Sequence, residues 1–205
     1  MARTVSIGRQ DFQKIRENHN FYIDKTRFIK EWWESEDEVT LITRPRRFGK
    51  TLNMSMLEKF FSFEYAGRAD LFEGLFIWEE EKYRHLQGSY PVLSLSFANV
   101  KEQDFEQAKQ GICQILSDLY DRHQFLLEGG LLTEKEQIFF KSVTRDMDEM
   151  TAKWALHKLS GFVSRYYGKR VLVFLDEYDT PMQEAYVNGY WDELAGFIRS
   201  FFHTA

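Results

Sequence analysis

The sequence lacks the features that are typical of secreted and membrane proteins, namely paired cysteines, long apolar runs and a signal peptide. Its 205 residues include a single cysteine, Cys113, so no internal disulfide can form. No apolar run reaches the ~20 residues that a membrane-spanning helix needs. The first residues, MARTVSIGRQDF, contain no apolar segment of the kind found in signal peptides. We therefore expect a soluble, cytoplasmic protein with no membrane partner.

An excess of charge of one sign is also missing. Lys and Arg total 27 against 32 Asp and Glu, and the formal net charge of −5 argues against indiscriminate binding to nucleic acid. Three prolines and twelve glycines leave little linker material, whereas 43% of the residues are apolar. A chain of this length buries a sizeable core without a metal or disulfide, so we expect one domain, or one domain with an appendage.

Hydrophobic periodicity predicts strands that alternate with helices. Apolar runs predict strands at 39–43, 91–97 and 171–175. Helical spacing predicts short helices within 6–34 and longer helices at 52–63, 102–127, 133–147, 151–167 and 182–202. Strands separated by helices indicate an α/β protein, a three-layer sandwich around a mainly parallel sheet. Residues 1–38 would form a helical N-terminal segment and residues 39–205 a nucleotide-binding core.

The segment 41–52, LITRPRRFGKTL, lies between a predicted strand and a predicted helix, where a phosphate-binding loop (Walker A motif) belongs. Gly49, Lys50 and Thr51 fill the last three positions of G-x-x-x-x-G-K-[ST]. Arg44 replaces the first glycine, and Pro45 removes one N–H donor. The candidate nucleotide-contacting residues are Arg44, Pro45, Arg46, Arg47, Phe48, Gly49, Lys50, Thr51 and Leu52. Taken alone, Gly-Lys-Thr is more often an ordinary helix start than a nucleotide site.

Two adjacent acids, Asp176 and Glu177, close the last predicted strand, as in a Walker B motif. In a P-loop site Asp176 would hold Mg²⁺ together with the Thr51 hydroxyl. The catalytic residues would be Glu177, as general base for the attacking water, and Lys50, on the outer phosphates. The alternative is that the two acids only cap a turn. The occurrence of both motifs, in this order and at strand ends, favours the nucleotide site.

Together these motifs resemble the AAA-ATPase-like family of bacterial and archaeal P-loop proteins. The family loop Arg-Pro-Arg-Arg-Phe-Gly-Lys-[Ser/Thr] and the strand end Asp-Glu-Tyr-Asp match residues 44–51 and 176–179. Lesser matches are YIDKT at 22–26, LFEGL at 71–75 and YPV at 90–92. The resemblance covers about residues 5–203 and implies an ATPase with ATP and Mg²⁺ as cofactors. It also implies that Arg44 is the usual residue at its position.

The resemblance also implies parts that the 205 residues do not include. P-loop ATPases with a catalytic glutamate normally have a further strand with a polar sensor residue, followed by an arginine finger. We therefore expect the P-loop sheet to be incomplete at the C-terminus and the core to be truncated. A C-terminal nuclease-like domain of the PD-(D/E)XK type, often fused to family members, is an expected partner in a longer protein.

Three functions remain open from the sequence. The first is ATP binding with Mg²⁺-dependent hydrolysis, and the second is a nucleotide-sensing switch with little turnover that acts on a partner or a fused effector. The third is a nucleic-acid-binding module that uses Arg44, Arg46 and Arg47, which the net charge does not support. For Asp24 and Lys25, the resemblance implies a place near the nucleotide. Structural capping is the alternative, and we favour it. No feature indicates an oligomeric state.

Overall fold

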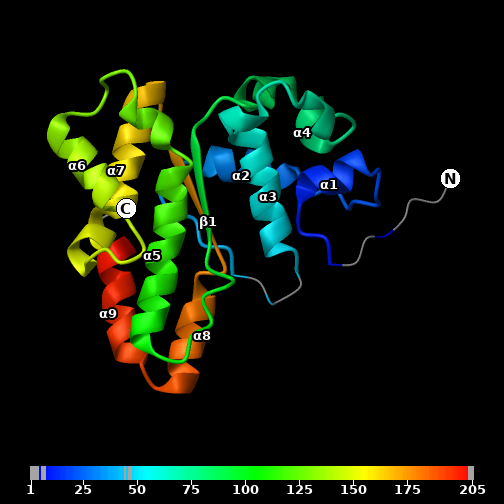
Figure 1. The fold of residues 1–205 in the computed structure, drawn as a ribbon. Helices are drawn as coiled ribbons and strands as arrows, with labels where there is room; N and C mark the ends of the chain where they lie inside the picture. Colours follow the sequence, from blue (N-terminus) through cyan, green and yellow to red (C-terminus); the bar gives the residue numbers. More distant parts are fainter. Residues whose placement is uncertain (1–4, 6–7, 44, 46–47, 203–205) are drawn as a thin grey trace. The chain divides into compact units, whose positions relative to one another are not determined.

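The computed structural model describes residues 5, 8–43, 45 and 48–202, and the chain forms two compact units, Met1–Val92 and Leu93–Ala205 (Figure 1). Both units are mainly helical. The described residues include one sheet, in which two parallel strands pair, β1 (Val92–Ser96) and β2 (Leu172–Asp176). The protein is therefore α/β, as predicted.

The first unit is built from short helices around an aromatic core. In chain order its elements are α1 (Phe12–Glu17), α2 (Arg27–Ser35), α3 (Lys50–Phe61), η1 (Phe63–Tyr65), η2 (Ala69–Leu71), α4 (Phe76–Glu79) and η3 (Glu81–Leu86). The ring of Phe12 stacks on that of Phe72 at 5.2 Å, and Phe60 meets Phe72 edge-on at 5.0 Å. All three side chains are fully buried. Aromatic pairs of this kind add to the free energy of apolar burial and hold α1 against α3.

The second unit packs helices against the two-stranded sheet. Its helices are α5 (Phe105–Asp121), η4 (Gln124–Leu127), α6 (Glu134–Ser142), α7 (Glu149–Tyr167), α8 (Asp179–Asn188) and α9 (Trp191–Phe202). Helices α5, α7 and α9 pack on one another, and Leu93, Leu95 and Phe97 belong to the same buried cluster. The buried Tyr120 hydroxyl of α5 donates to the Ala155 carbonyl of α7 over 2.8 Å, which satisfies a polar group inside this core.

Two of the three predicted strands are formed, and the strand predicted at 39–43 is wrong. Residues 39–43 are all described and adopt no strand, and Val39 and Leu41 are 87% and 62% exposed. A strand is stabilised by backbone pairing and by burial of its side chains, and this segment has neither. The three-layer sandwich is therefore not confirmed in the described part of the chain.

The helix predicted at 182–202 is two helices. Gly189 has φ +84° and its N–H donates to the Ala185 carbonyl over 2.9 Å, so α8 ends there. Glycine adopts this left-handed conformation at little cost, which makes it a common helix terminator. The helix predicted at 102–127 likewise stops at Asp121 and is followed by a 3₁₀ turn. Helices α2, α3 and α7 lie where helical spacing predicts them, whereas α6 ends at Ser142, before the predicted end at 147.

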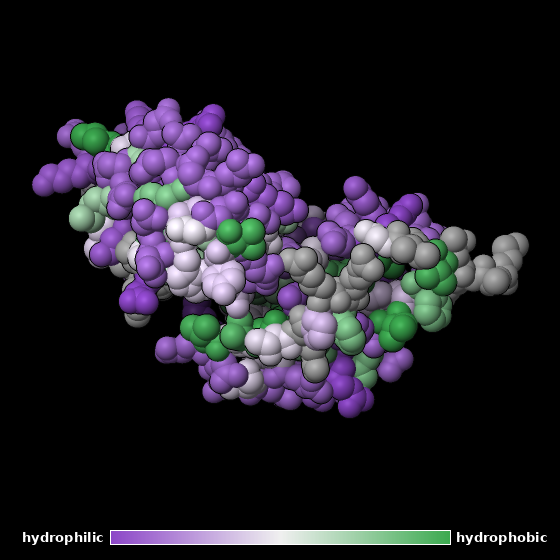
Figure 2. Space-filling model, turned by 90° about the horizontal axis from the view of Figure 1, so that it is seen from below, coloured by the Kyte–Doolittle hydropathy of each residue, from purple (hydrophilic) through white to green (hydrophobic). Residues whose placement is uncertain are grey.

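The exposed face shown in Figure 2 is mostly hydrophilic and is interrupted by a few apolar patches. Among the helices that the structure describes, none has the length and apolar character to cross a bilayer.

Candidate functional site

The phosphate-loop candidates lie at the start of α3 in the first unit. Gly49 has φ +78° and immediately precedes Lys50, the first residue of the helix. Its N-cap residue is a glycine and so provides no side-chain cap, and the first backbone bond of the helix runs from the Asn53 N–H to the Gly49 carbonyl over 2.9 Å. The N–H groups of Lys50, Thr51 and Leu52 therefore have no acceptor within the helix. Such an end attracts an anion, since these N–H groups carry partial positive charge.

Only part of the basic loop before this helix is described. Pro45 accepts a weak bond from the Phe48 N–H at 3.4 Å, and the Phe48 side chain is exposed. Lys50, Thr51 and Leu52 are half-buried. The candidates Arg44, Arg46 and Arg47 lie outside the described residues.

Lys25, which is 24 positions upstream, lies beside the loop glycine. A Cβ atom at Gly49 would be 3.5 Å from the Lys25 ammonium, an ordinary contact. Lys25 is exposed and makes no ion pair with any residue that the structure describes. A cation beside the positive end of a helix is unfavourable unless an anion joins them, so this arrangement suits a phosphate group.

Asp24, the neighbour of Lys25, has a different role. Its Oδ1 accepts hydrogen bonds from the Thr26 N–H at 2.8 Å and the Thr26 hydroxyl at 2.7 Å, and its Oδ2 accepts from the Phe76 N–H at 2.7 Å. The fully buried Thr26 hydroxyl in turn accepts from the Ile77 N–H over 3.1 Å. Asp24 therefore joins the start of α2 to the start of α4, the structural capping that the sequence favours.

The helix behind the loop is held by α1 and the segment that follows it. The Ser55 hydroxyl of α3 accepts from the Phe12 N–H over 3.0 Å, and the Tyr22 hydroxyl contacts the sulfur of Met56 at 3.3 Å. Burial raises the pKa of Tyr22 to about 12. In the first turns of α3, the Asn53 Oδ1 is buried and finds no hydrogen-bond partner among the described residues.

The two acids lie in the second unit, at the carboxyl end of β2. Asp176 is the last residue of the strand, and its carbonyl accepts from the Phe97 N–H, directly after β1, over 3.0 Å. Glu177 turns the chain with φ +53°, a left-handed conformation that is uncommon for a glutamate. Its N–H donates to the Asp176 Oδ1 over 3.1 Å. The turn then leads into α8, whose first residue is Asp179.

A metal held by protein side chains alone does not fit the described residues. They contain no group of three or more His, Cys, Asp or Glu that could hold an ion. Mg²⁺ bound to a nucleotide needs only one or two protein oxygens, because phosphate and water supply the other ligands. One hydroxyl, such as that of Thr51, and one carboxylate, such as that of Asp176, have the right chemistry for this second kind of site.

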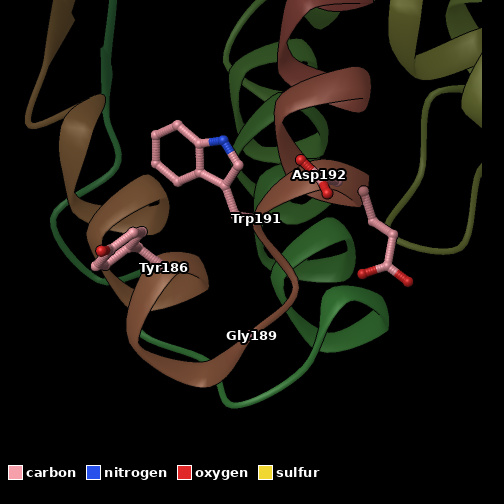
Figure 3. Close-up of a pocket in the computed structure, with 5 residues that line it drawn as sticks. Tyr186, Gly189, Trp191 and Asp192 are labelled. Carbon is pink, nitrogen blue, oxygen red and sulfur yellow. The ribbon is translucent and has the colours of Figure 1, made fainter.

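An open hollow at the turn between α8 and α9 is a poorer candidate for a nucleotide. It has a volume of about 730 Å³ and is lined by Tyr186, Gly189, Trp191, Asp192 and Glu193 (Figure 3). The Tyr186 and Trp191 rings meet edge-on at 6.1 Å. Its charged groups are two carboxylates, which repel the phosphates of a nucleotide.

The sequence did not single out Thr180, although its side chain contacts Glu177. Its hydroxyl donates to the Glu177 Oε2 over 3.2 Å, and its N–H donates to the Glu177 carbonyl over 3.0 Å. The only signal for this contact is the spacing of three residues at a strand-to-helix turn. The site roles predicted for Lys50, Thr51, Asp176 and Glu177 stay predictions, because the first two residues belong to one unit and the other two to the second.

Comparison with known proteins places these motifs in a family. The family described as predicted AAA-ATPase matches residues 6–205. The chain is 31% identical over 181 residues to a protein of Azotobacter chroococcum mcd 1 that is described as an uncharacterized protein in the vnfD 5′ region. That match covers 88% of this chain and 30% of the relative, so the chain spans less than a third of the relative's length. No solved structure matches the chain.

Proposed function

The chain belongs to the predicted AAA-ATPase family, and on this premise we propose that it binds ATP with Mg²⁺ and hydrolyses it. The observation that carries the proposal is the start of α3, whose N-cap residue is a glycine without a capping side chain. Gly49 in its left-handed conformation, the N–H groups of Lys50, Thr51 and Leu52, and the Lys25 ammonium all belong to this end of the helix. This set of donors and cations matches the chemistry of a polyphosphate.

The residues of the first unit bind and orient the nucleotide. The N–H groups after Gly49 donate to phosphate oxygens, and the Lys50 ammonium neutralises the outer phosphates. Lys25 adds a second cation at the same loop. The Thr51 hydroxyl, one residue further along α3, would hold the ion, and bound Mg²⁺ would neutralise charge on the phosphates.

Two carboxylates of the second unit would provide a metal ligand and the general base. The Asp176 carboxylate would complete the ion's ligands, and the Glu177 carboxylate would take the proton of the attacking water. The proposal therefore requires that Asp176 and Glu177 reach the nucleotide that Lys50 and Thr51 bind.

A nucleotide-dependent switch with little turnover is the second candidate. The start of α3 supports nucleotide binding by itself, and a bound nucleotide can shift a conformational equilibrium without being hydrolysed. In this case ATP binds as tightly, but phosphate is released no faster by the wild type than by a variant without the general base.

The two functions are separated by two substitutions and a control. Lys50→Ala removes the outer-phosphate cation from a helix position that tolerates alanine, so ATP binding measured by calorimetry should be lost. Glu177→Gln should retain binding and lose phosphate release. Lys135→Ala, on the exposed surface of α6, is the matched control and should change neither.

Unchanged ATP affinity in Lys50→Ala would show that ATP does not bind at Lys50. Tight binding with equal phosphate release by wild type and Glu177→Gln would favour the switch instead of the ATPase.

A further inference from the structure

The turn after β2 holds Glu177 in a conformation that costs free energy. With φ +53° its backbone is left-handed, and a residue other than glycine pays of order 1 kcal/mol or more for this. Such a conformation persists only where surrounding contacts stabilise it. The contacts here come from both sides, from Asp176 before the residue and from Thr180 after it.

Thr180 contacts Glu177 at both its backbone and its side chain. The Thr180 N–H donates to the Glu177 carbonyl over 3.0 Å, and the Thr180 hydroxyl donates to the Glu177 Oε2 over 3.2 Å. Thr180 is only 6% exposed, whereas Glu177 is half-buried. A buried hydroxyl without a partner is costly, so Thr180 holds its acceptor, the carboxylate, in one place.

We infer that Thr180 is a positioning residue for the general base, an inference that rests on the proposed ATPase function. One carboxylate oxygen, Oε2, accepts the bond from the Thr180 hydroxyl, and the other, Oε1, can take a proton. In the reaction the water gives this proton to Oε1, its oxygen bonds to the terminal phosphorus, and the bond from phosphorus to the β-phosphate oxygen breaks and releases ADP. A carboxylate fixed by a buried hydroxyl is already oriented for that transfer, which lowers the entropic part of the barrier.

The simpler role for Thr180 is to support the start of α8. Thr180 is the second residue of that helix, and the N-cap residue, Tyr178, makes no side-chain capping bond. A purely structural role predicts that substitutions lower the stability of the protein and leave the turnover of folded protein unchanged. A positioning role predicts a loss of turnover number that follows the hydroxyl alone.

Two substitutions separate the hydroxyl of Thr180 from its methyl group. Thr180→Val keeps the buried shape and removes the donor, and Thr180→Ser keeps the donor and removes the methyl group. If Thr180 positions Glu177, the Val variant should lose about tenfold in kcat with little change in KM or ATP affinity, because one hydrogen bond to a charged group is lost. The Ser variant should retain wild-type kcat, even if its melting temperature falls.

The Glu177→Gln variant tests whether Thr180 acts through Glu177. Adding Thr180→Val to Glu177→Gln should cause no further loss of kcat, because the group that Thr180 positions is already inactive. Equal kcat in wild type and the Val variant, or a loss in Ser that matches the loss in Val, would overturn the inference and leave the proposed function intact. Equal phosphate release by wild type and Glu177→Gln, or no release by wild type, would overturn the role of Glu177 and the inference with it.

Discussion

Two neighbouring residues, Asp24 and Lys25, provide the sharpest test of how the first unit is built. They are adjacent in the sequence and opposite in charge, yet their contacts differ completely. The Asp24 carboxylate accepts three hydrogen bonds, whereas the Lys25 ammonium lies beside Gly49 and pairs with no carboxylate in the described part of the chain. Replacing Asp24 by alanine should destabilise the protein, and replacing Lys25 should weaken ATP binding.

The expected loss for Asp24→Ala follows from its three bonds. Their lengths of 2.7–2.8 Å are those of charge-assisted hydrogen bonds. At a net value of about 1 kcal/mol each, reduced because Asp24 is exposed and water replaces part of the loss, the free energy of unfolding should fall by roughly 2 kcal/mol. Asp24→Asn keeps the acceptor for Thr26 and loses the acceptor for the Phe76 N–H, so it should lose about half as much.

Urea denaturation followed by tryptophan fluorescence measures the effect. The first unit contains Trp32, Trp33 and Trp78, and the Trp33 ring stacks on the buried Phe61 at 5.4 Å. Hydrogen exchange supplies a local measurement, since the amide of Phe76 should lose protection in Asp24→Ala. Asp37→Ala, at an exposed carboxylate that accepts no hydrogen bond from the described residues, is the control and should leave stability unchanged.

Lys25→Ala should leave the urea midpoint unchanged and lower ATP affinity by about tenfold, the effect of one lost cation–phosphate contact. A loss of stability in Lys25→Ala as large as that in Asp24→Ala would refute the division of roles. Unchanged ATP affinity would remove Lys25 from the phosphate site.

Three further predictions concern single positions. Gly49→Ala should lose about 1 kcal/mol of stability, because its φ of +78° is left-handed. Gly161→Ala, at an exposed position of α7 where a Cβ meets nothing within 4 Å, should gain about 0.5–1 kcal/mol. Urea denaturation measures both changes in the free energy of unfolding. Tyr120→Phe should lower the free energy of unfolding by about 1–2 kcal/mol, since the Ala155 carbonyl loses its 2.8 Å donor, and a change within the error of that measurement would contradict this reading. Burial raises the pKa of the Cys113 thiol to about 11. At pH 8 a thiol reagent should therefore label the native protein at least ~100-fold more slowly than the protein in urea. Equally fast labelling would show that the core around α5 is open to the reagent.

Local patterns predicted the parts of the fold that local forces determine. The continuous apolar run of β2 and the alternating run of β1 are both strands in the structure, although burial alternates along β2 as well and Val173 is exposed. The break at Gly189 was missed, because the helix was predicted as continuous over 182–202, although Asn188-Gly189 is a turn signal inside the helical pattern. The error at 39–43 has another origin, since an apolar run forms a strand only if a neighbouring strand pairs with it, and pairing is not a local property.

The candidate site shows the same division between local and distant information. Gly49 and Lys50 could be named from a motif, and the start of α3 at Lys50 agrees with it. The approach of Lys25 to Gly49 joins residues 24 positions apart and has no local signal. The contact between Thr180 and Glu177 is close in sequence, but it depends on the left-handed backbone of Glu177, which no propensity predicts for a glutamate.

Each of the two motifs contains a residue whose backbone is left-handed, a glycine in one and a glutamate in the other. Gly49 and Glu177 are both left-handed, and each lies within two residues of a helix start. Glycine takes this conformation at little cost, and a glycine or asparagine at 177 would relieve the turn of strain. A glutamate is costlier there, and contacts with Asp176 and the buried Thr180 stabilise it. Stability alone would not select a glutamate at this position. We propose that its carboxylate, which the buried Thr180 hydroxyl contacts at the end of a parallel strand, has a chemical task there, and the substitutions at Glu177 and Thr180 test this proposal.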